Sequence, residues 1–252
     1  GDVKYTGLKR LVIKTAAGGT VRTDDNVAST PSPSSFAESF ETATAMIAST
    51  TLIVGDHVRT LGYLTLGDGG GNDYDIVAAA TGTADGGVYI DLATHQALGL
   101  FSNGVHSVRQ WGSVGTTDNT TVNQAAVLYA ETNGYSLFFP PHADGYLTEK
   151  INIKTGGIKI YGEHTTMIHK YETIETSGGA GTTNAWPVFM VYRGAHDVEV
   201  TGFKFTSHSS IATVQAAVPG WESYLSHIAV NSADNIWIHH NEFSGTQPRA
   251  IF

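Results

Sequence analysis

Ile158-Lys-Ile160, Val198-Glu-Val200 and Ile236-Trp-Ile238 are apolar triplets with a variable middle residue, spaced by 40 (158 to 198) and 38 residues (198 to 236). A second apolar triplet precedes each of them: Ile151-Asn-Ile153, Phe189-Met-Val191 and Ile228-Ala-Val230. Recurrence of one unit at a long, nearly constant interval predicts a solenoid of stacked coils. Because successive side chains of a strand point to opposite faces, the outer residues of each triplet face inward and the middle residue faces outward.

Composition sets the fold class. The chain has 252 residues, of which 41% are hydrophobic and 15% charged. This apolar content is enough for a real core, in one long β domain or two smaller ones. The 29 glycines and the low charge content are typical of short strands joined by turns. The sequence therefore predicts a mostly β protein.

Charge and cysteine content argue against several functions. The net charge is −9, from 14 basic and 23 acidic residues, whereas nucleic-acid binding requires a basic stripe. Cysteine is absent, which removes disulfides and thiolate metal sites. No apolar run approaches the roughly 20 residues that span a bilayer, and no signal peptide is visible. We expect no nucleic-acid partner and no membrane insertion.

The positions of proline and glycine indicate how the chain is divided into segments. The segment Thr30–Ser35 is rich in proline and serine and predicts a linker over 1–35. Ser35 with Glu38 forms a capping-box pattern, which predicts a helix ending near Ser49. Short strands with glycine turns then predict a compact β module within 36–104, at Leu52–Val54, His57–Leu61, Tyr74–Val77 and Val88–Ile90. Gly67–Gly71 precedes a strand and lacks a following Lys-Ser/Thr, so a phosphate loop, and with it a cofactor, is not expected.

The β module leads into the predicted solenoid. Val105–Val114 predicts a connecting strand within a neck at 105–115, and a helix follows over about 121–132, ended by Asn133-Gly134. This amphipathic helix is expected to cap the open end of the solenoid, which occupies 116–252. The pattern stops in mid-coil at Phe252 without a capping segment, which is typical of a truncated chain.

Several of these segments resemble a known family. Val108-Arg-Gln-Trp-Gly-Ser-Val-Gly115, Asp118-Asn-Thr120 and Leu137-Phe-Phe-Pro-Pro141 resemble the start of pectate-lyase-like right-handed parallel β-helices. Val54–Tyr63 with Gly67-Asp-Gly-Gly-Gly71 is similar to the module that precedes the β-helix in bacteriophage tailspikes. One departure is Gly115-Thr-Thr-Asp118, where the family usually has Gly-Asp-Gly, and it affects the details of that loop.

The resemblance implies a function. Tailspikes are homotrimers on the virion tail that attach to bacterial surface polysaccharide at the host cell surface and commonly cleave it. By this resemblance, 1–35 is a linker or virion-proximal segment, 36–104 a head or adaptor, 105–115 the neck and 116–252 the first coils of the β-helix. The expected work of this piece is virion attachment and trimerisation, with other tail or baseplate proteins as partners.

The whole protein is expected to bind and depolymerise capsule or O-antigen. Hydrolysis is favoured over β-elimination, because arginine and lysine are sparse, and this piece is expected to be inactive alone. Two alternatives stay open: a secreted pectate-lyase-like lyase or hydrolase, and a non-catalytic glycan-binding adhesin fibre.

The outward ladder Lys159, Glu199 and Trp237 is the first candidate site. An indole ring can stack on a pyranose, and a carboxylate can bind hydroxyls or donate a proton. The alternative is that Trp237 packs under a loop or against a neighbouring subunit. Glycoside hydrolysis needs two carboxyl groups about 5–10 Å apart. The candidate pairs are Asp197 or Glu199 with Asp234, and Glu199 with Glu222, and spacing does not choose among them.

Two long excursions and a histidine pair complete the candidates. The segments 169–187 and 206–227 carry Trp186, Trp221 and Tyr224, which are glycan-binding candidates unless the loops serve subunit contact. Adjacent histidines on a strand point opposite ways, so His239-His240 is a poor chelate and no metal is expected. Asn241 is expected to join a structural ladder of stacked polar side chains.

Overall fold

The computed structural model describes residues 38–102, 104–115, 117–170, 187–207 and 226–244 with their side chains, and the backbone of 9–14 and 20–27. The chain divides into two compact units, Gly1–Phe36 and Ala37–Phe252. The first unit contains an antiparallel hairpin of β1 (Lys9–Lys14) and β2 (Thr20–Val27).

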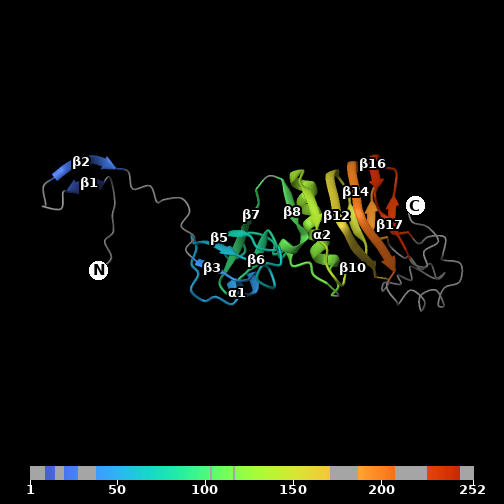
Figure 1. The fold of residues 1–252 in the computed structure, drawn as a ribbon, viewed down its shortest axis with the longest axis horizontal. Coiled ribbons are helices and arrows are strands. Elements are labelled where there is room, and N and C mark those ends of the chain that lie inside the picture. Colours follow the sequence, from blue (N-terminus) through green and yellow to red (C-terminus); the bar gives the residue numbers. More distant parts are fainter. Residues whose placement is uncertain are drawn as a thin grey trace. The chain divides into compact units, whose positions relative to one another are not determined.

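The second unit begins with a five-stranded sheet, which we call the head sheet. Its strand order is β3-β4-β5-β7-β6, with β3 and β4 parallel and the other pairs antiparallel (Figure 1). The alternating strand β5 turns Tyr74 and Ile76 into a core shared with Met46 of the short helix. The elements are β3 (Glu38–Phe40), α1 (Ala43–Ile47), β4 (His57–Thr60), β5 (Asp73–Ala78), β6 (Tyr89–Asp91) and β7 (His95–Leu100).

Parts of the head sheet differ from the sequence-based prediction. The helix predicted from Ser35 to Ser49 is shorter, because Phe40 pairs with Thr60 in a strand and Thr42 caps α1 through Ala45 N. The strand predicted at Leu52–Val54 is a loop, and strand β7 was not predicted. Phe40 and β7 are in strands because each pairs with a strand distant in sequence, β4 and β5 respectively.

The glycine-rich segment 67–71 is a turn organised by one carboxylate. Asp68 accepts hydrogen bonds from the backbone N–H groups of Tyr63, Leu64, Thr65 and Gly70, at 2.8–3.2 Å. Partial burial acts to raise the pKa of Asp68, but these bonds outweigh it and hold that pKa below its ordinary value. The glycine-rich segment therefore forms a tight loop, and its backbone N–H groups bind the carboxylate of Asp68 rather than an external anion.

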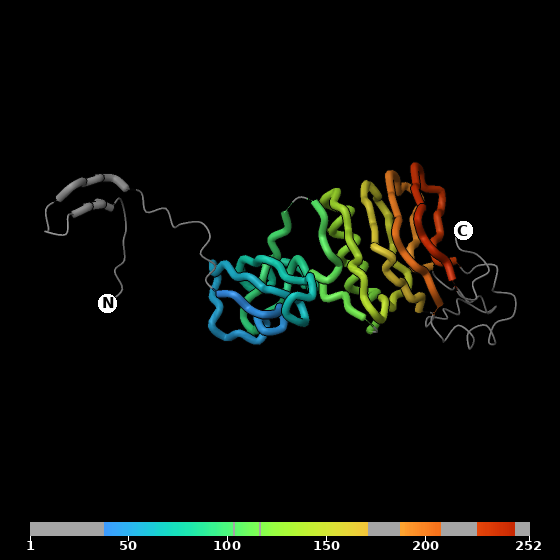
Figure 2. Tube along the Cα trace, viewed as in Figure 1, coloured from blue at the N-terminus to red at the C-terminus, as the bar shows by residue number. Residues whose placement is uncertain are grey.

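A parallel β-helix follows, and Figure 2 shows its successive turns of chain side by side. One sheet has the order β11-β13-β15, and the other runs β16-β14-β12-β9-β8 with β10 and β17 attached. The strands that precede the first coil are β8 (Val105–Ser107), β9 (Ser136–Phe139) and β10 (Tyr146–Thr148). Coil one is β11 (Ile151–Ile153) and β12 (Gly156–His169), coil two is β13 (Phe189–Val191) and β14 (His196–Ser207), and coil three is β15 (Ile228–Val230), β16 (Asp234–His239) and β17 (Glu242–Phe243). All six predicted triplets lie in these strands.

The predicted register is confirmed. Ile158 pairs with Val198 and Val198 with Ile236, so one residue of each coil stacks on the next. Ile158, Val198 and Val200 are buried, while Ile236 and Ile238 of the last coil are partly buried against the same core. The chain is therefore mostly β, with a small β module followed by β-helix coils, as predicted.

Aromatic side chains fill the interior of the coils. Phe189 is fully buried, and its ring lies 6.3 Å from Phe139, 5.8 Å from Phe203 and 6.1 Å from Phe205. The stack continues through Phe205 to Phe243, whose rings are parallel at 5.2 Å. This column ties coils one to three together along the axis.

Helix α2 (Thr120–Asn133) packs on the first coil, and its predicted stop is confirmed by left-handed Gly134 (φ 67°). The side-chain amide of Gln124 donates to Asn152 O and accepts from Asn152 N. It thus satisfies backbone groups of β11 that a neighbouring strand would otherwise bind. Glu131 accepts from the backbone N–H groups of Lys154, Thr155 and Gly156.

No helix in the described part of the chain is long and apolar enough to cross a membrane.

The strand predicted over Val105–Val114 ends early, at Ser107. A capping box between Ser107 and Gln110 starts the 3-10 helix η1 (Val108–Trp111), while β8 (Val105–Ser107) pairs with β9 (Ser136–Phe139). Arg109 then connects three segments, donating to Asp68 O, Pro141 O and the hydroxyl of Tyr146 in β10 (Tyr146–Thr148).

One buried histidine makes the stability of the β-helix depend on pH. His227 lies among His169, Phe205 and Phe243, and burial lowers its pKa from 6.5 to about 4, with only partial compensation from the Ser244 backbone. Between these values the unfolded chain binds more protons than the folded one, so stability falls as pH falls from 6.5 towards 4. We expect a loss of about 2–3 kcal/mol from this group, measured by urea unfolding at several pH values.

The variant His227→Phe tests that dependence. It should flatten the pH profile over this window, because a phenyl ring stacks on Phe205 and Phe243 without taking up a proton. His164→Gln is the matched control, since the His164 side chain is 79% exposed. An unchanged slope in His227→Phe would assign the acid sensitivity to other groups.

Candidate functional site

The outward side chains of one parallel sheet form a continuous surface, which we call the outer face. Its first row is Lys159, Glu199 and Trp237, which are register partners on β12, β14 and β16. Its second row, two residues further along each strand, is Phe138, Tyr161, Thr201 and His239. The predicted ladder is therefore confirmed as a register, and a second row lies beside it.

A shallow groove of about 280 Å³ follows the first row. Its walls include Lys159, Glu199 and Trp237, together with Asp197 and Asn235 from the adjacent corner of the coil. Trp237 is 58% exposed, so much of its side chain is accessible to a ligand. The groove thus joins an aromatic plane to a set of polar groups.

Glu199 is the electrostatic centre of the groove. Lys159 Nζ donates to Glu199 Oε1 at 2.8 Å, and His239 Nε2 lies 3.1 Å from the same oxygen. The hydrogen bond and charge of Lys159, followed by those of His239, hold the pKa of Glu199 below its ordinary value. Glu199 is therefore an anion at neutral pH, and is suited to accepting hydrogen bonds rather than to donating a proton.

Asp197 and Asn235 occupy a sharp corner that repeats from coil to coil. The equivalent residues Gly157, Asp197 and Asn235 are all left-handed, with φ of 69°, 52° and 55°. Glycine, aspartate and asparagine are the residues that adopt this conformation most readily. His196 Nδ1 lies 2.9 Å from Asp197 Oδ2 and Asn235 Nδ2 donates to Asp197 Oδ1, and these two contacts lower the pKa of Asp197.

The second row carries aromatic rings that the sequence interpretation missed. Phe138 and Tyr161 stack at 5.0 Å, and Lys159 Nζ lies 5.6 Å from the centre of the Tyr161 ring. Their outward direction follows from alternation, because Leu137 and Ile160 beside them are buried. Extending the triplet Ile158–Ile160 by one residue would have found Tyr161, and Phe138 is the middle residue of the apolar triplet Leu137–Phe139.

The histidine pair does not behave as predicted. The two rings are not on opposite faces: His239 Nδ1 and His240 Nδ1 are 2.6 Å apart, because His240 is left-handed (φ 53°) at the end of the strand. Within the described ranges, no group of three or more His, Cys, Asp or Glu side chains is arranged to hold a metal ion. Asn241 has a structural role, donating to Val200 O and accepting from Phe203 N of the preceding coil.

The other predicted site residues are not brought into the groove. Asp234 lies at the start of β16 opposite His196, and it is not among the residues that line the groove. Glu222, Trp221, Tyr224 and Trp186 lie outside the described residues. The catalytic pairing of Glu199 with Glu222, or of Asp197 or Glu199 with Asp234, stays a prediction.

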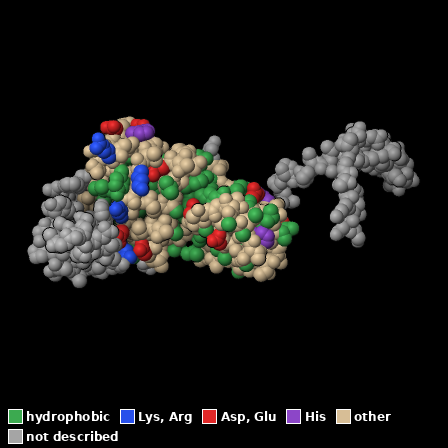
Figure 3. Space-filling model, turned by 180° about the vertical axis from the view of Figure 1, so that it is seen from behind, with side chains coloured by type: hydrophobic (Ala, Val, Ile, Leu, Met, Phe, Trp, Pro, Cys, Tyr) green, Lys and Arg blue, Asp and Glu red, His purple; other side chains and the backbone are tan. Residues whose placement is uncertain are grey.

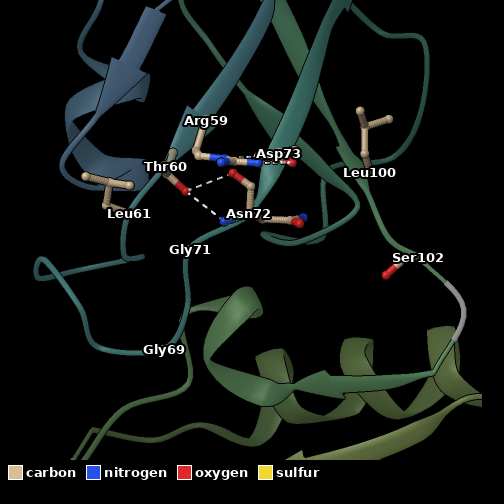
Figure 4. Close-up of a pocket in the computed structure, with 9 residues that line it drawn as sticks. All are labelled: Arg59, Thr60, Leu61, Gly69, Gly71, Asn72, Asp73, Leu100 and Ser102. Atoms are coloured by element: carbon tan, nitrogen blue, oxygen red, sulfur yellow. Dashed lines mark hydrogen bonds and ion pairs between the residues drawn. The ribbon is translucent and has the colours of Figure 1, made fainter. Parts of the chain in front are cut away.

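A second pocket, of about 540 Å³, lies in the head (Figure 4). Arg59 and Asp73 line it, and they form a bidentate pair with N–O distances of 2.6 and 2.9 Å. Thr60 accepts from Asn72 N beside this pair. Because the guanidinium and the carboxylate neutralise each other, this pocket presents less charge to a ligand than the groove of the outer face does.

Comparisons with known proteins bear on the fold. No protein-family model and no curated protein matches the sequence. Pantoea stewartii WceF, described as a glycan biofilm modifying enzyme with a bacteriophage tailspike-like parallel β-helix fold, matches with a TM-score of 0.55 and 13% identity over 96% of this chain and 34% of its own. The tailspike protein of Acinetobacter baumannii phage AM24 matches with a TM-score of 0.50 and 11% identity over 81% of this chain and 32% of its own.

The chain thus spans about a third of the length of these two proteins. At such low identity the likeness concerns the fold, and in the match to WceF it covers nearly all of this chain. The chain has a tailspike-like parallel β-helix fold.

Proposed function

We propose that this chain is the N-terminal part of a phage tailspike, which attaches the protein to the virion tail and starts its trimer, while the whole protein binds and depolymerises bacterial surface polysaccharide. The observation that carries the proposal is the order of the elements: a small β module, then a capping helix, then β-helix coils. The match to WceF covers nearly all of this chain. Of the two structures compared above, WceF is described as an enzyme that modifies glycan, and the phage AM24 protein is a tailspike.

Exposed apolar side chains of the head support the assembly role. Leu61, Leu64 and Leu66 are 45–60% exposed on the loop organised by Asp68. Clustered exposed leucines favour a buried contact with another chain. Tail or baseplate proteins and the other subunits of a trimer are the proposed partners, and the virion tail is the proposed location.

The oligomeric state tests the assembly role. Multi-angle light scattering of this chain should give about 80 kDa, three times 26.7 kDa, because homo-oligomers close by symmetry. Leu61→Ser/Leu64→Ser/Leu66→Ser should shift the mass towards the monomer, whereas Leu128→Ser, on the exposed side of α2, should leave it unchanged. A monodisperse monomer of the unaltered chain would contradict the trimer and favour a secreted enzyme.

The depolymerase role is tested on the longer protein. Oligosaccharides should appear when it is incubated with host capsule or O-antigen, and their mass separates hydrolysis from β-elimination, which leaves an unsaturated product. Binding without release of products would favour the adhesin fibre.

A further inference from the structure

The outer face combines flat apolar rings with hydrogen-bonding side chains on one rigid sheet. Trp237 stands at one end of the first row, and the stacked pair Phe138–Tyr161 begins the second row. We propose that this face is a binding site for an uncharged saccharide chain. The inference rests on the proposed polysaccharide-binding function, and it adds where on this chain the glycan binds and of which charge class it is.

The spacing of the rings suits a chain of sugars rather than a single sugar. Trp237 and Tyr161 are two strands and two residues apart, which places their Cα atoms roughly 12 Å from each other at ordinary strand geometry. One pyranose cannot contact both rings. An oligosaccharide lying diagonally across β12, β14 and β16 can stack on both of them and cross the polar groups between.

Those polar groups are mostly hydrogen-bond acceptors suited to sugar hydroxyls. Glu199 Oε1 is occupied by Lys159 and His239, while Glu199 Oε2 accepts no hydrogen bond from the described part of the chain. The Thr201 hydroxyl lies on the same face, two residues further along β14, and is 3.3 Å from His239 Nδ1. Because Lys159 and His239 hold the carboxylate in place, its free oxygen is directed without further loss of side-chain freedom.

Charge selects the class of saccharide. Asp197 and Glu199 both line the groove as carboxylates, and the positive charge of Lys159 is already paired with Glu199. A uronic acid or a sialic acid in the groove would meet these carboxylates at short range, which is repulsive. The groove therefore favours neutral sugars. Figure 3 shows one side of the molecule, on which basic side chains lie singly among acidic and polar ones.

Affinity electrophoresis and tryptophan fluorescence of the full 252-residue chain test the proposal. The neutral probes are dextran, mannan and galactan, and the acidic probes are hyaluronate and polygalacturonate. We expect at least one neutral polymer to retard the protein and change its fluorescence, with little dependence on salt, and no acidic polymer to do so.

Three variants locate the site. Trp237→Ala should weaken binding about tenfold, because it removes one stacking platform. Leu128→Ala is the matched control, a side chain of nearly equal exposure (59% against 58%) on α2, and it should bind as the unaltered chain does. Glu199→Gln should weaken the binding of neutral polymers and also allow acidic polymers to bind, because the positive charge of Lys159 is then no longer paired with a carboxylate.

Each outcome decides the matter. Equal binding by Trp237→Ala, or a change of oligomeric mass instead of affinity in that variant, would overturn the site and assign the ring to a protein contact. Tight binding of an acidic polymer that Trp237→Ala abolishes would overturn the charge class but keep the site. Failure of every neutral polymer to bind would overturn the inference, whereas the proposed function is decided separately by oligosaccharide release from the longer protein.

Discussion

Gly156→Ala is expected to destabilise the β-helix by about 3–5 kcal/mol, although it adds a single methyl group. Gly156 pairs with His196 in the next coil and has φ of 82°. A Cβ atom there would overlap the backbone carbonyl and amide of His196. The two coils cannot keep their pairing unless one of them moves, and Gly156 N also holds the carboxylate of Glu131. Urea unfolding followed by circular dichroism measures the loss.

The neighbouring glycine provides the control. Gly157 is also left-handed (φ 69°), but a Cβ atom there would meet open space. Gly157→Ala should therefore cost only the backbone strain of about 1–2 kcal/mol. Gly157→Asn should cost less, since Asn235 stands at the equivalent corner of coil three. Equal losses at the two glycines would show that strain, rather than the contact between coils, is the cause.

Phe189→Ala is the second large effect, with an expected loss of about 3–5 kcal/mol. The ring is fully buried in the middle of the aromatic column and contacts Phe139, Phe203 and Phe205. Removing it leaves a cavity between coils one and two that the rigid strands cannot close. The midpoint of urea unfolding should fall at an unchanged m-value.

The matched control is an outward phenylalanine. Phe138 stacks on Tyr161 on the outer face, and Phe138→Ala should cost about 1 kcal/mol or less, as for a cross-strand pair. A loss at Phe138 as large as that at Phe189 would contradict the assignment of inward and outward faces. Together the two variants test the alternation on which the outer face depends.

The strand pattern was predictable because its signal is local and repeated. Alternation within each triplet identified Val198 and Val200 as interior, and the interval between triplets paired Glu199 with Lys159 and Trp237. The end of α2 was also readable, since glycine is the residue that adopts a left-handed helix stop most readily. None of these conclusions needs knowledge of a distant partner.

The candidate site was predictable only in part. Its first row followed from the triplets, and its second row, with Phe138 and Tyr161, lay within reach of the same reasoning. The ionisation of Glu199 was not predictable, because it is set by Lys159 and His239, each 40 residues away in sequence. Nor could the sequence exclude Asp234 from the groove, since exclusion depends on where the corner of the coil lies.

The repeat, the inward and outward faces and the stop of the capping helix could be derived from the residues alone, because alternation and glycine conformation are local properties and the repeat only multiplies them. The other features depend on contacts between distant parts of the chain. Phe40 belongs to a strand and not to the predicted helix because it pairs with Thr60, and His239 meets His240 because a left-handed corner turns the second ring back. Each of these outcomes depends on a contact or a bend whose energy appears only when distant parts of the chain are brought together.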